Sequence, residues 1–236
     1  MERQLSDLVA RMKTAFGEHL VSAVLYGSAA MGDWDERGSD LNVLCVLDSL
    51  TPAELSASEP VFRWWRGEGN PPPLLLTEEE VRTSTDCFPM EFHDMKEHRR
   101  ILFGSDLIAD LEIDRSFYRA QVEHELRAKQ IRLRQKAAEV LTEPKRLTKL
   151  LTDSISTFCV LGRHALLLSG DQPRWAKREI LASLERALNR RLSGANAILS
   201  IRISGEKNAG AADLSVLEQY LRDVDALVRF VDALDK

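Results

Sequence analysis

The sequence of 236 residues contains little cysteine and no long apolar run. No stretch approaches the roughly 18 consecutive apolar residues that a membrane-spanning helix requires. The first residues, MERQLSDLVARMK, lack the apolar core of a secretory signal. Cys45, Cys87 and Cys159 share no metal-ligand spacing and stand among apolar neighbours, which predicts buried thiols in a reducing compartment. We therefore expect a cytoplasmic protein without a membrane segment, a disulfide or a zinc site.

Several motifs that mark common enzyme classes are also missing. The stretch GSAAMG, residues 27–32, has neither the order GxSxG of a hydrolase nucleophile nor the order GxGxxG of a dinucleotide site. The chain has no phosphate-loop lysine motif and no pattern of interleaved basic and aromatic residues. Together with the net charge of −5, these absences argue against those enzyme classes and against a dedicated nucleic-acid binder.

Charge is divided unevenly along the chain. Residues 1–110 contain 10 Lys and Arg against 20 Asp and Glu, whereas residues 111–236 contain 22 against 17. The first part is suited to hold cations and the second to meet anions, although chance differences between solvated faces explain the same counts. One predicted helix of the second part carries a basic run, formed by Arg127, Lys129, Arg132, Arg134 and Lys136.

Apolar periodicity predicts a small α/β unit over residues 1–112. Helices are indicated over 3–17, from Thr51 with an interruption at Pro60, and after Thr77, which forms a capping box with Glu80. The predicted strands cover residues 21–26, 41–47, 74–76 and 88–95. The strand at 41–47 is almost wholly apolar, as expected of a strand that is covered on both faces.

Residues 113–236 show long helical patterns without strands. The predicted helices cover 114–141 and 144–169, and two more begin at Pro173 and Asp213. The fold class is therefore α+β. It consists of a small mixed β-sheet domain with flanking helices over residues 1–112, followed by an all-α helical bundle over residues 113–236.

The stretch LYGSAAMGDWDERGSDLNVLCVL, residues 25–47, carries the candidate site. Gly27 and Ser28 end the first predicted strand, where glycine permits close approach of a ligand and a following helix presents backbone N–H groups to an anion. Asp40 and Asn42 are two residues apart at the second strand, so their side chains are expected to share a face. A phosphate at the turn beside a cation on the carboxylate is the arrangement that nucleotidyl transfer requires.

This pattern resembles the signature of the polymerase-β-like nucleotidyltransferases. The signature consists of an apolar strand, Gly-Ser, here eleven intervening residues, and an acid-hydrophobe-acid-hydrophobe run. The early helix and the terminal bundle are similar to those of aminoglycoside nucleotidyltransferases. The resemblance implies that Asp40 holds Mg²⁺ and that Gly27 and Ser28 cradle the β- and γ-phosphates of a nucleoside triphosphate. The chain departs from the pattern at Asn42, where the family has a second carboxylate, although an Asn oxygen can ligate Mg²⁺.

The family's third carboxylate comes from a later strand, and the stretch CFPMEFHDM, residues 87–95, is the candidate here. If this segment is a strand with Met90 and Phe92 in the protein core, Glu91 points to the opposite face, toward the site. Glu91 is then expected to act as a metal ligand or general base. Asp94 is the reserve candidate. His93 is interpreted either as a proton acceptor at the site or as a hydrogen-bonded structural residue.

The resemblance implies a Mg²⁺-dependent enzyme that moves a nucleoside monophosphate, AMP from ATP, to a hydroxyl of a small molecule such as an aminoglycoside. Asp40, Asn42 and Glu91 form the expected metal site. Because Asn42 replaces a carboxylate, the alternative is a catalytically impaired nucleotide-binding or regulatory module of the same fold. A third hypothesis is an interaction protein similar to the minimal nucleotidyltransferase partner of a toxin pair. An oligomer stays possible, and neither a membrane nor nucleic acid is expected as a partner.

Overall fold

The structure is a computed structural model that describes residues 1–30, 40–172, 174–205 and 211–234. The chain divides into two compact units, Met1–Arg115 and Ser116–Lys236. The first contains a four-stranded sheet with helices, and the described part of the second contains helices without strands. The predicted α+β fold class is therefore confirmed. The division into functional domains at 112/113 stays a prediction.

The first unit is built on a mixed sheet with the strand order β3-β2-β1-β4. Its strands are β1 (Leu20–Tyr26), β2 (Asn42–Leu47), β3 (Leu74–Thr77) and β4 (Arg99–Gly104). β1 pairs antiparallel with β2 on one side and with β4 on the other, whereas β2 and β3 are parallel. β1 is thus a central strand, and its register fixes which residues lie at each end of the sheet.

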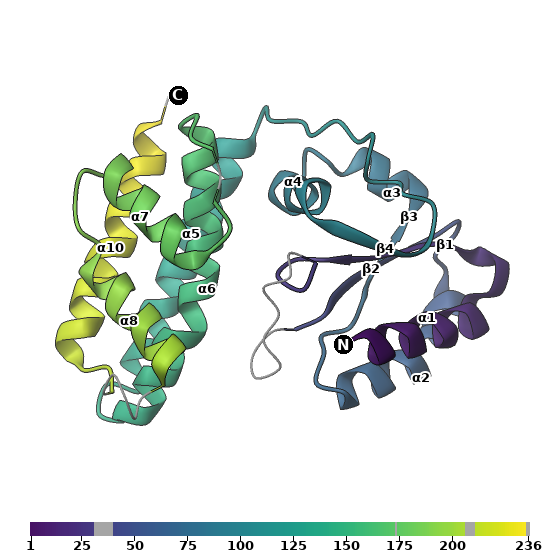
Figure 1. Ribbon diagram of the computed structural model, residues 1–236, viewed down its shortest axis with the longest axis horizontal. Coiled ribbons are helices and arrows are strands. Elements are labelled where there is room, and N and C mark those ends of the chain that lie inside the picture. The colour runs from purple at the N-terminus through teal and green to yellow at the C-terminus, as the bar shows by residue number, and fades with distance from the viewer. Residues whose placement is uncertain (31–39, 173, 206–210, 235–236) are drawn as a thin grey trace. The chain divides into compact units, whose positions relative to one another are not determined.

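Helices cover both faces of this sheet (Figure 1). They are the α-helices α1 (Glu2–Phe16), α2 (Pro52–Gly67), α3 (Glu78–Thr83) and α4 (Pro89–Glu97). A short 3₁₀ helix, η1, spans Gly17–His19. Leu25 and Val43 pack with α1 and α2 in one buried cluster, while Val24 and Leu44 pack with α3 and α4 in another. Adjacent residues of β1 and β2 therefore serve opposite cores, which explains why both strands are almost wholly apolar.

The predicted strand at 88–95 is wrong, because this segment forms helix α4. Pro89 occupies the first helical turn, where a missing N–H costs nothing, and the stretch PMEFHDMKE has no β-branched residue to favour a strand. The fourth strand is β4, which pairs with β1 at the sheet edge. Glu91 is therefore carried by a helix, and it does not share a strand face with His93.

Several smaller predictions about the first unit can also be compared with the structure. The capping box of Thr77 and Glu80 is confirmed at the start of α3. Pro60 does not interrupt α2, which continues through it from Pro52 to Gly67. Cys45 and Cys159 are buried as expected, whereas Cys87 is exposed. Residues 31–39, which belong to the stretch with the candidate site, lie outside the described residues.

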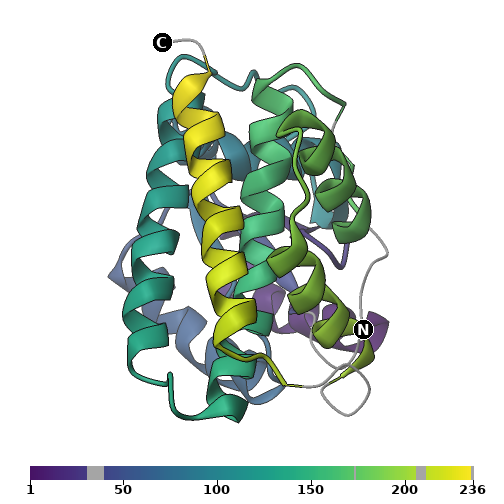
Figure 2. The same ribbon diagram turned by 90° about the vertical axis from the view of Figure 1, so that its left-hand side faces the viewer.

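The described part of the second unit contains five helices. They are α5 (Tyr118–Ala138), α6 (Pro144–Leu168), α7 (Lys177–Ala187), α8 (Ser193–Ser204) and α10 (Leu214–Ala233). Figure 2 shows that the long helices α5, α6 and α10 run along one another. Helix α8 was not predicted, and Pro173, the predicted start of another helix, lies outside the described residues. Helix α10 begins as predicted after Asp213, whose carboxylate accepts the N–H of Val216 and so caps the helix. No helix within the described ranges combines the length and apolar character that crossing a bilayer demands.

Helices α8 and α10 approach each other very closely at the start of α8. A Cβ added at Gly194 would overlap the backbone of Gln219 and Tyr220 in α10. The buried carboxylate of Asp223 accepts a hydrogen bond from the N–H of Ala195 at 3.0 Å, so α10 also caps α8. Burial raises the pKa of Asp223. The bundle therefore depends on a backbone contact that leaves no room for a side chain.

We expect Gly194→Ala to lower the free energy of unfolding by about 2 kcal/mol, because a methyl group must push α8 away from α10. Gly67→Ala is the control, since a Cβ at Gly67 meets no heavy atom within 4 Å. Urea unfolding followed by circular dichroism measures both variants. Equal midpoints for Gly194→Ala and the wild type would contradict the close packing.

Candidate functional site

The β1–β2 pair brings two parts of the sequence motif together. In the register of this pair, Tyr26 is opposite Asn42. Gly27 follows with a φ of 76°, a conformation that favours glycine, and its carbonyl accepts a hydrogen bond from the N–H of Ala30 at 3.0 Å. A Cβ at Gly27 would lie 3.3 Å from Nδ2 of Asn42. The glycine turn is thus directly beside the Asn42 side chain, and Ser28 continues that turn.

Asp40 lies just outside strand β2, and its side chain is exposed. Because β2 begins at Asn42, strand alternation does not fix the direction of the Asp40 side chain. The segment is held instead by Asn70, which is buried and whose Oδ1 accepts the N–H of Leu41 at 3.1 Å. This hydrogen bond ties the residue between Asp40 and Asn42 to the loop before β3, so Asn70 positions both candidate ligands.

Glu91 is exposed in the first turn of α4. Burial raises the pKa of the Tyr26 phenol, and the negative charge of Glu91 raises this pKa further. Tyr26 is the last residue of β1 and is opposite Asn42. Glu91 is thus carried by a helix and not by a strand, and its place in the metal site stays a prediction.

The helix also changes the choice between Glu91 and Asp94. In a strand, residues three apart point to opposite faces, but in a helix they are neighbours on one side. Asp94 is partly buried, and its carboxylate is 3.7 Å from Nδ1 of His93, which is buried. Glu91 is the more accessible of the two acids, so it is the better candidate to meet a ligand. His93 lies in the interior as a partner of Asp94, in keeping with its structural interpretation.

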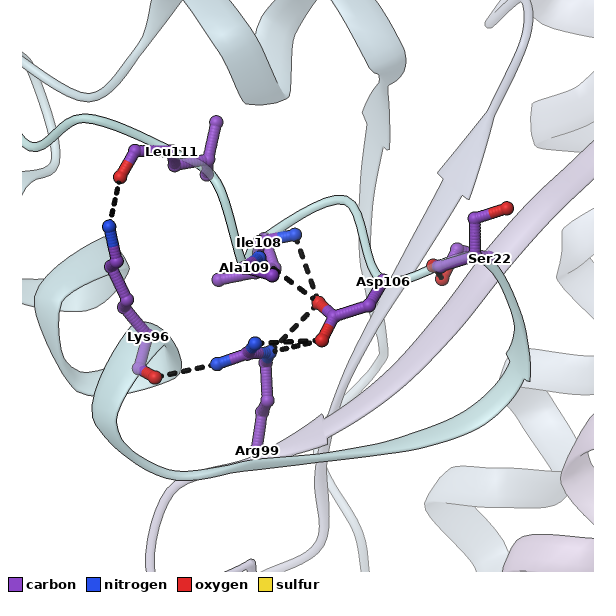
Figure 3. Close-up of polar contacts among 8 residues, drawn as sticks. Ser22, Lys96, Arg99, Asp106, Ile108, Ala109 and Leu111 are labelled. Atoms are coloured by element: carbon purple, nitrogen blue, oxygen red, sulfur yellow. Dashed lines mark hydrogen bonds and ion pairs between the residues drawn. The ribbon is translucent and has the colours of Figure 1, made fainter.

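A polar network fixes α4 to the rest of the unit (Figure 3). The guanidinium of Arg99, the first residue of β4, donates to both carboxylate oxygens of Asp106 at 2.7–3.0 Å and also to the carbonyl of Lys96 at 2.6 Å. Asp106 also accepts the N–H groups of Ile108 and Ala109. Lys96 in turn donates to the carbonyl of Leu111 at 2.5 Å. The network joins the end of α4, β4 and the segment 106–111, and so positions the helix that carries Glu91.

The candidate residues suit a magnesium ion in their chemistry. Asp40 and Glu91 offer carboxylate oxygens and Asn42 offers an amide oxygen, and Mg²⁺ prefers oxygen ligands and retains several waters. Asp40 and Glu91 are exposed, so both carboxylates can be reached by a hydrated ion. The amide of Asn42 reaches the turn at Gly27, where a phosphate is expected. The donor set therefore fits a metal that also binds phosphate oxygens.

Two residues that support the site were not found in the sequence. Asn70 stands in the stretch GNPPP, which is typical of a loop, and nothing in the sequence indicates that its side chain reaches Leu41. Asp106 lies seven residues after Arg99, beyond the end of a strand that was not predicted. Its contacts become apparent only once 99–104 is recognised as a strand.

The chain has the fold of a solved adenyltransferase, which confirms the predicted resemblance at the level of the fold. Among solved structures, it is similar to spectinomycin adenyltransferase AAD(9) from Enterococcus faecialis, determined with ATP and spectinomycin. The match covers 98% of this chain and 99% of that chain, with a TM-score of 0.62 and 14% sequence identity. No family model and no curated protein matches the sequence. At this identity, the likeness establishes the fold alone.

We expect Asp106→Ala to destabilise the first unit by about 1–2 kcal/mol, because it leaves Arg99 and two backbone N–H groups without their acceptor. Hydrogen bonds with Arg99 hold the pKa of Asp106 below its ordinary value. Its contribution to stability is therefore present above the ordinary carboxyl pKa and is lost as the pH falls through the lowered value.

Unfolding midpoints measured from pH 7 down to pH 3 test this prediction. The difference between wild type and Asp106→Ala is expected to be largest at neutral pH and to shrink in acid. Asp110→Ala, a nearby acid that has no part in the network of Figure 3, is the control. A difference between wild type and Asp106→Ala that stays constant with pH would count against the network.

Proposed function

We propose that the protein is a Mg²⁺-dependent nucleotidyltransferase that moves AMP from ATP to a hydroxyl group of a small molecule in the cytoplasm. The observation that supports this proposal is the register of β1 and β2, in which Tyr26 is opposite Asn42 and the Gly27 turn lies beside the Asn42 side chain; Asp40 precedes Asn42 by two residues. The shared fold with a protein determined with ATP and spectinomycin supports a nucleotide substrate and a small-molecule acceptor.

Each candidate residue has a defined part in this proposal. Gly27 and Ser28 bind the β- and γ-phosphates, because the glycine lets the backbone approach them closely and the following turn offers N–H groups. Asp40, Asn42 and Glu91 would hold Mg²⁺, which would neutralise charge on the phosphate oxygens. Glu91 alternatively accepts the proton of the acceptor hydroxyl, a task that suits its exposed position.

The reaction is balanced without any further reagent. The acceptor oxygen forms a bond to the α-phosphorus of ATP while the bond from this phosphorus to the bridging oxygen of pyrophosphate breaks. The hydroxyl proton passes to a carboxylate, for which Glu91 is the candidate. The products are an adenylated acceptor and pyrophosphate, so release of pyrophosphate reports the reaction.

The side chain of Asn42 favours a second candidate function. An amide at this position supplies no negative charge, and Mg²⁺ is usually held by carboxylates together with substrate phosphates. A protein with this fold and a weakened metal site would bind ATP without transferring AMP. It would then serve as a nucleotide-binding or regulatory module.

We expect Asp40→Ala to lower Mg²⁺-dependent AMP transfer by about 100-fold or more, because it removes a carboxylate from the metal site. Its exposed side chain makes a loss of folding unexpected. Calorimetric titration with ATP, with and without Mg²⁺, and a pyrophosphate assay with a panel of hydroxylated acceptors measure binding and transfer separately. Asp7→Ala, which removes an exposed acid from α1, is the matched control.

The two candidate functions give different results in this experiment. Binding and pyrophosphate release that are both lost in Asp40→Ala support the enzyme. Metal-dependent ATP binding without release in the wild type, with release appearing in Asn42→Asp, supports the nucleotide-binding module. Intact transfer in Asp40→Ala would refute the role of Asp40 at the metal site, and the absence of ATP binding in the wild type would refute both functions.

We expect Glu91→Gln to reduce transfer by about 10- to 100-fold, while Glu97→Gln leaves it within a factor of two. Both acids are exposed on α4, so the pair separates a role at the site from a general effect of charge on this helix. Turnover and ATP affinity measured on both variants test this expectation. Equal activity of the two variants would remove Glu91 from the site.

A further inference from the structure

A cavity outside the candidate site lies between the first two helices of the bundle. Its volume is about 240 Å³, and its lining belongs entirely to α5 and α6 and the side chains they present. The lining residues are Lys129, Arg132, Leu133, Lys136, Leu150, Asp153, Ser154, Thr157 and Phe158. All of them lie within the second unit, so the cavity is a feature of the bundle itself. We call it the α5–α6 cavity.

Three cations from α5 line one side of this cavity. Lys129, Arg132 and Lys136 are spaced three and four residues apart, which places them on successive turns of one helix side. Lys129 is 3.5 Å from Glu125 in a half-exposed pair, which neutralises its charge only weakly. Within the described residues, neither Arg132 nor Lys136 has an acidic side chain within ion-pair distance. Two cationic groups at the cavity therefore have no acidic partner in the part of the chain that the structure describes.

The opposite side of the cavity contributes one acid and two hydroxyl groups. The carboxylate of Asp153 pairs with Lys149 at 2.8 Å, but both side chains are mostly exposed, so Asp153 keeps its negative charge against the three cations of α5. The hydroxyl of Ser154 donates to the carbonyl of Leu151 at 2.8 Å, and its oxygen lies 3.1 Å from the Tyr220 hydroxyl. The local charge of the lining is therefore positive, with polar groups available opposite the cations.

The cavity also has an apolar base. Leu133 and Phe158 form its floor and are buried, with 3% and 5% of their surfaces exposed, whereas Leu150 is only half-buried. A bare inorganic ion would use the cations and leave the accessible surface of Leu150 in contact with water. A ligand with both an anionic head and an apolar body would use both parts of the lining.

We propose that the α5–α6 cavity binds a small organic phosphate. Its phosphate group lies among Lys129, Arg132 and Lys136, and its apolar body contacts Leu150 and the floor formed by Leu133 and Phe158. A phosphate suits this lining better than a carboxylate, because a phosphate monoester carries nearly two negative charges, spread over three oxygens, and can engage several cations at once. The proposal does not depend on the function proposed for the first unit.

Calorimetric titration with phenyl phosphate, in the absence of ATP and Mg²⁺, tests the proposal on the full-length protein. We expect saturable binding with a stoichiometry of one. Inorganic phosphate and phenol serve as separate probes for the head and the body, and each is expected to bind at least about 10-fold more weakly than phenyl phosphate. AMP, tested in parallel, shows whether a nucleotide is a suitable form of the same chemistry.

The double variant Arg132→Ala/Lys136→Ala is expected to weaken phenyl phosphate binding by about 10-fold or more. Both side chains are exposed, so the bundle should keep its circular dichroism spectrum. Arg134→Ala is the matched control, because Arg134 is an exposed cation of the same helix that does not line the cavity. It is expected to change the affinity by less than about twofold.

Three results would overturn the proposal. One is the absence of saturable phenyl phosphate binding in the millimolar range. Another is equal weakening by Arg134→Ala and the double variant, which would indicate nonspecific attraction to a basic helix surface. The third is equal affinity for inorganic phosphate and phenyl phosphate, which would show that the apolar base takes no part. Because no arm uses ATP, each of these results is independent of the transfer reaction.

Discussion

The antiparallel pairing of β1 with β2 is the constraint on which the first unit depends. Both strands are covered by helices on two faces, so a shift of the register by one residue would exchange the two buried sets, Leu25 and Val43 for Val24 and Leu44. This cost holds Tyr26 opposite Asn42 and keeps the Gly27 turn beside the Asn42 amide. The packing of two apolar cores therefore determines the geometry of a polar site at the end of the sheet.

The parts of the fold that follow from local pattern were predictable from the sequence. The uninterrupted apolar strand at β2, the capping box before α3 and the Asp213 cap of α10 each depend on neighbouring residues, and each is present. The segment 88–95 was misread because alternation of apolar and polar residues in a short stretch is compatible with both periods. Pro89 was the available signal for a helix, and the apolar run in RRILFG marked the actual strand.

The candidate site was predictable only in part, and the division has a physical cause. Gly27, Ser28, Asp40 and Asn42 lie in one short stretch whose spacing is visible in the sequence. Asn70, by contrast, acts through one hydrogen bond to a residue 29 positions away, and such a contact leaves no local pattern. Asp40 is exposed and Gly27, Ser28 and Asn42 are half-buried, whereas Asn70, which holds the backbone between Asp40 and Asn42, is buried. Sequence motifs therefore indicated the chemistry and missed its support.

Asn42 connects the electrostatics of the site to its proposed chemistry. In a site with two adjacent carboxylates, mutual repulsion is relieved only when a cation binds, and this relief contributes to metal affinity. An amide beside Asp40 removes the repulsion between two carboxylates, and it also removes one of the two negative charges that attract a cation. A cation without a nucleotide therefore binds less strongly at such a site. The phosphates of a bound nucleotide supply the missing negative charge. The affinity of this site for a cation should therefore depend on the nucleotide more strongly than in a site with two carboxylates, and the Gly27 turn becomes the main determinant of what binds.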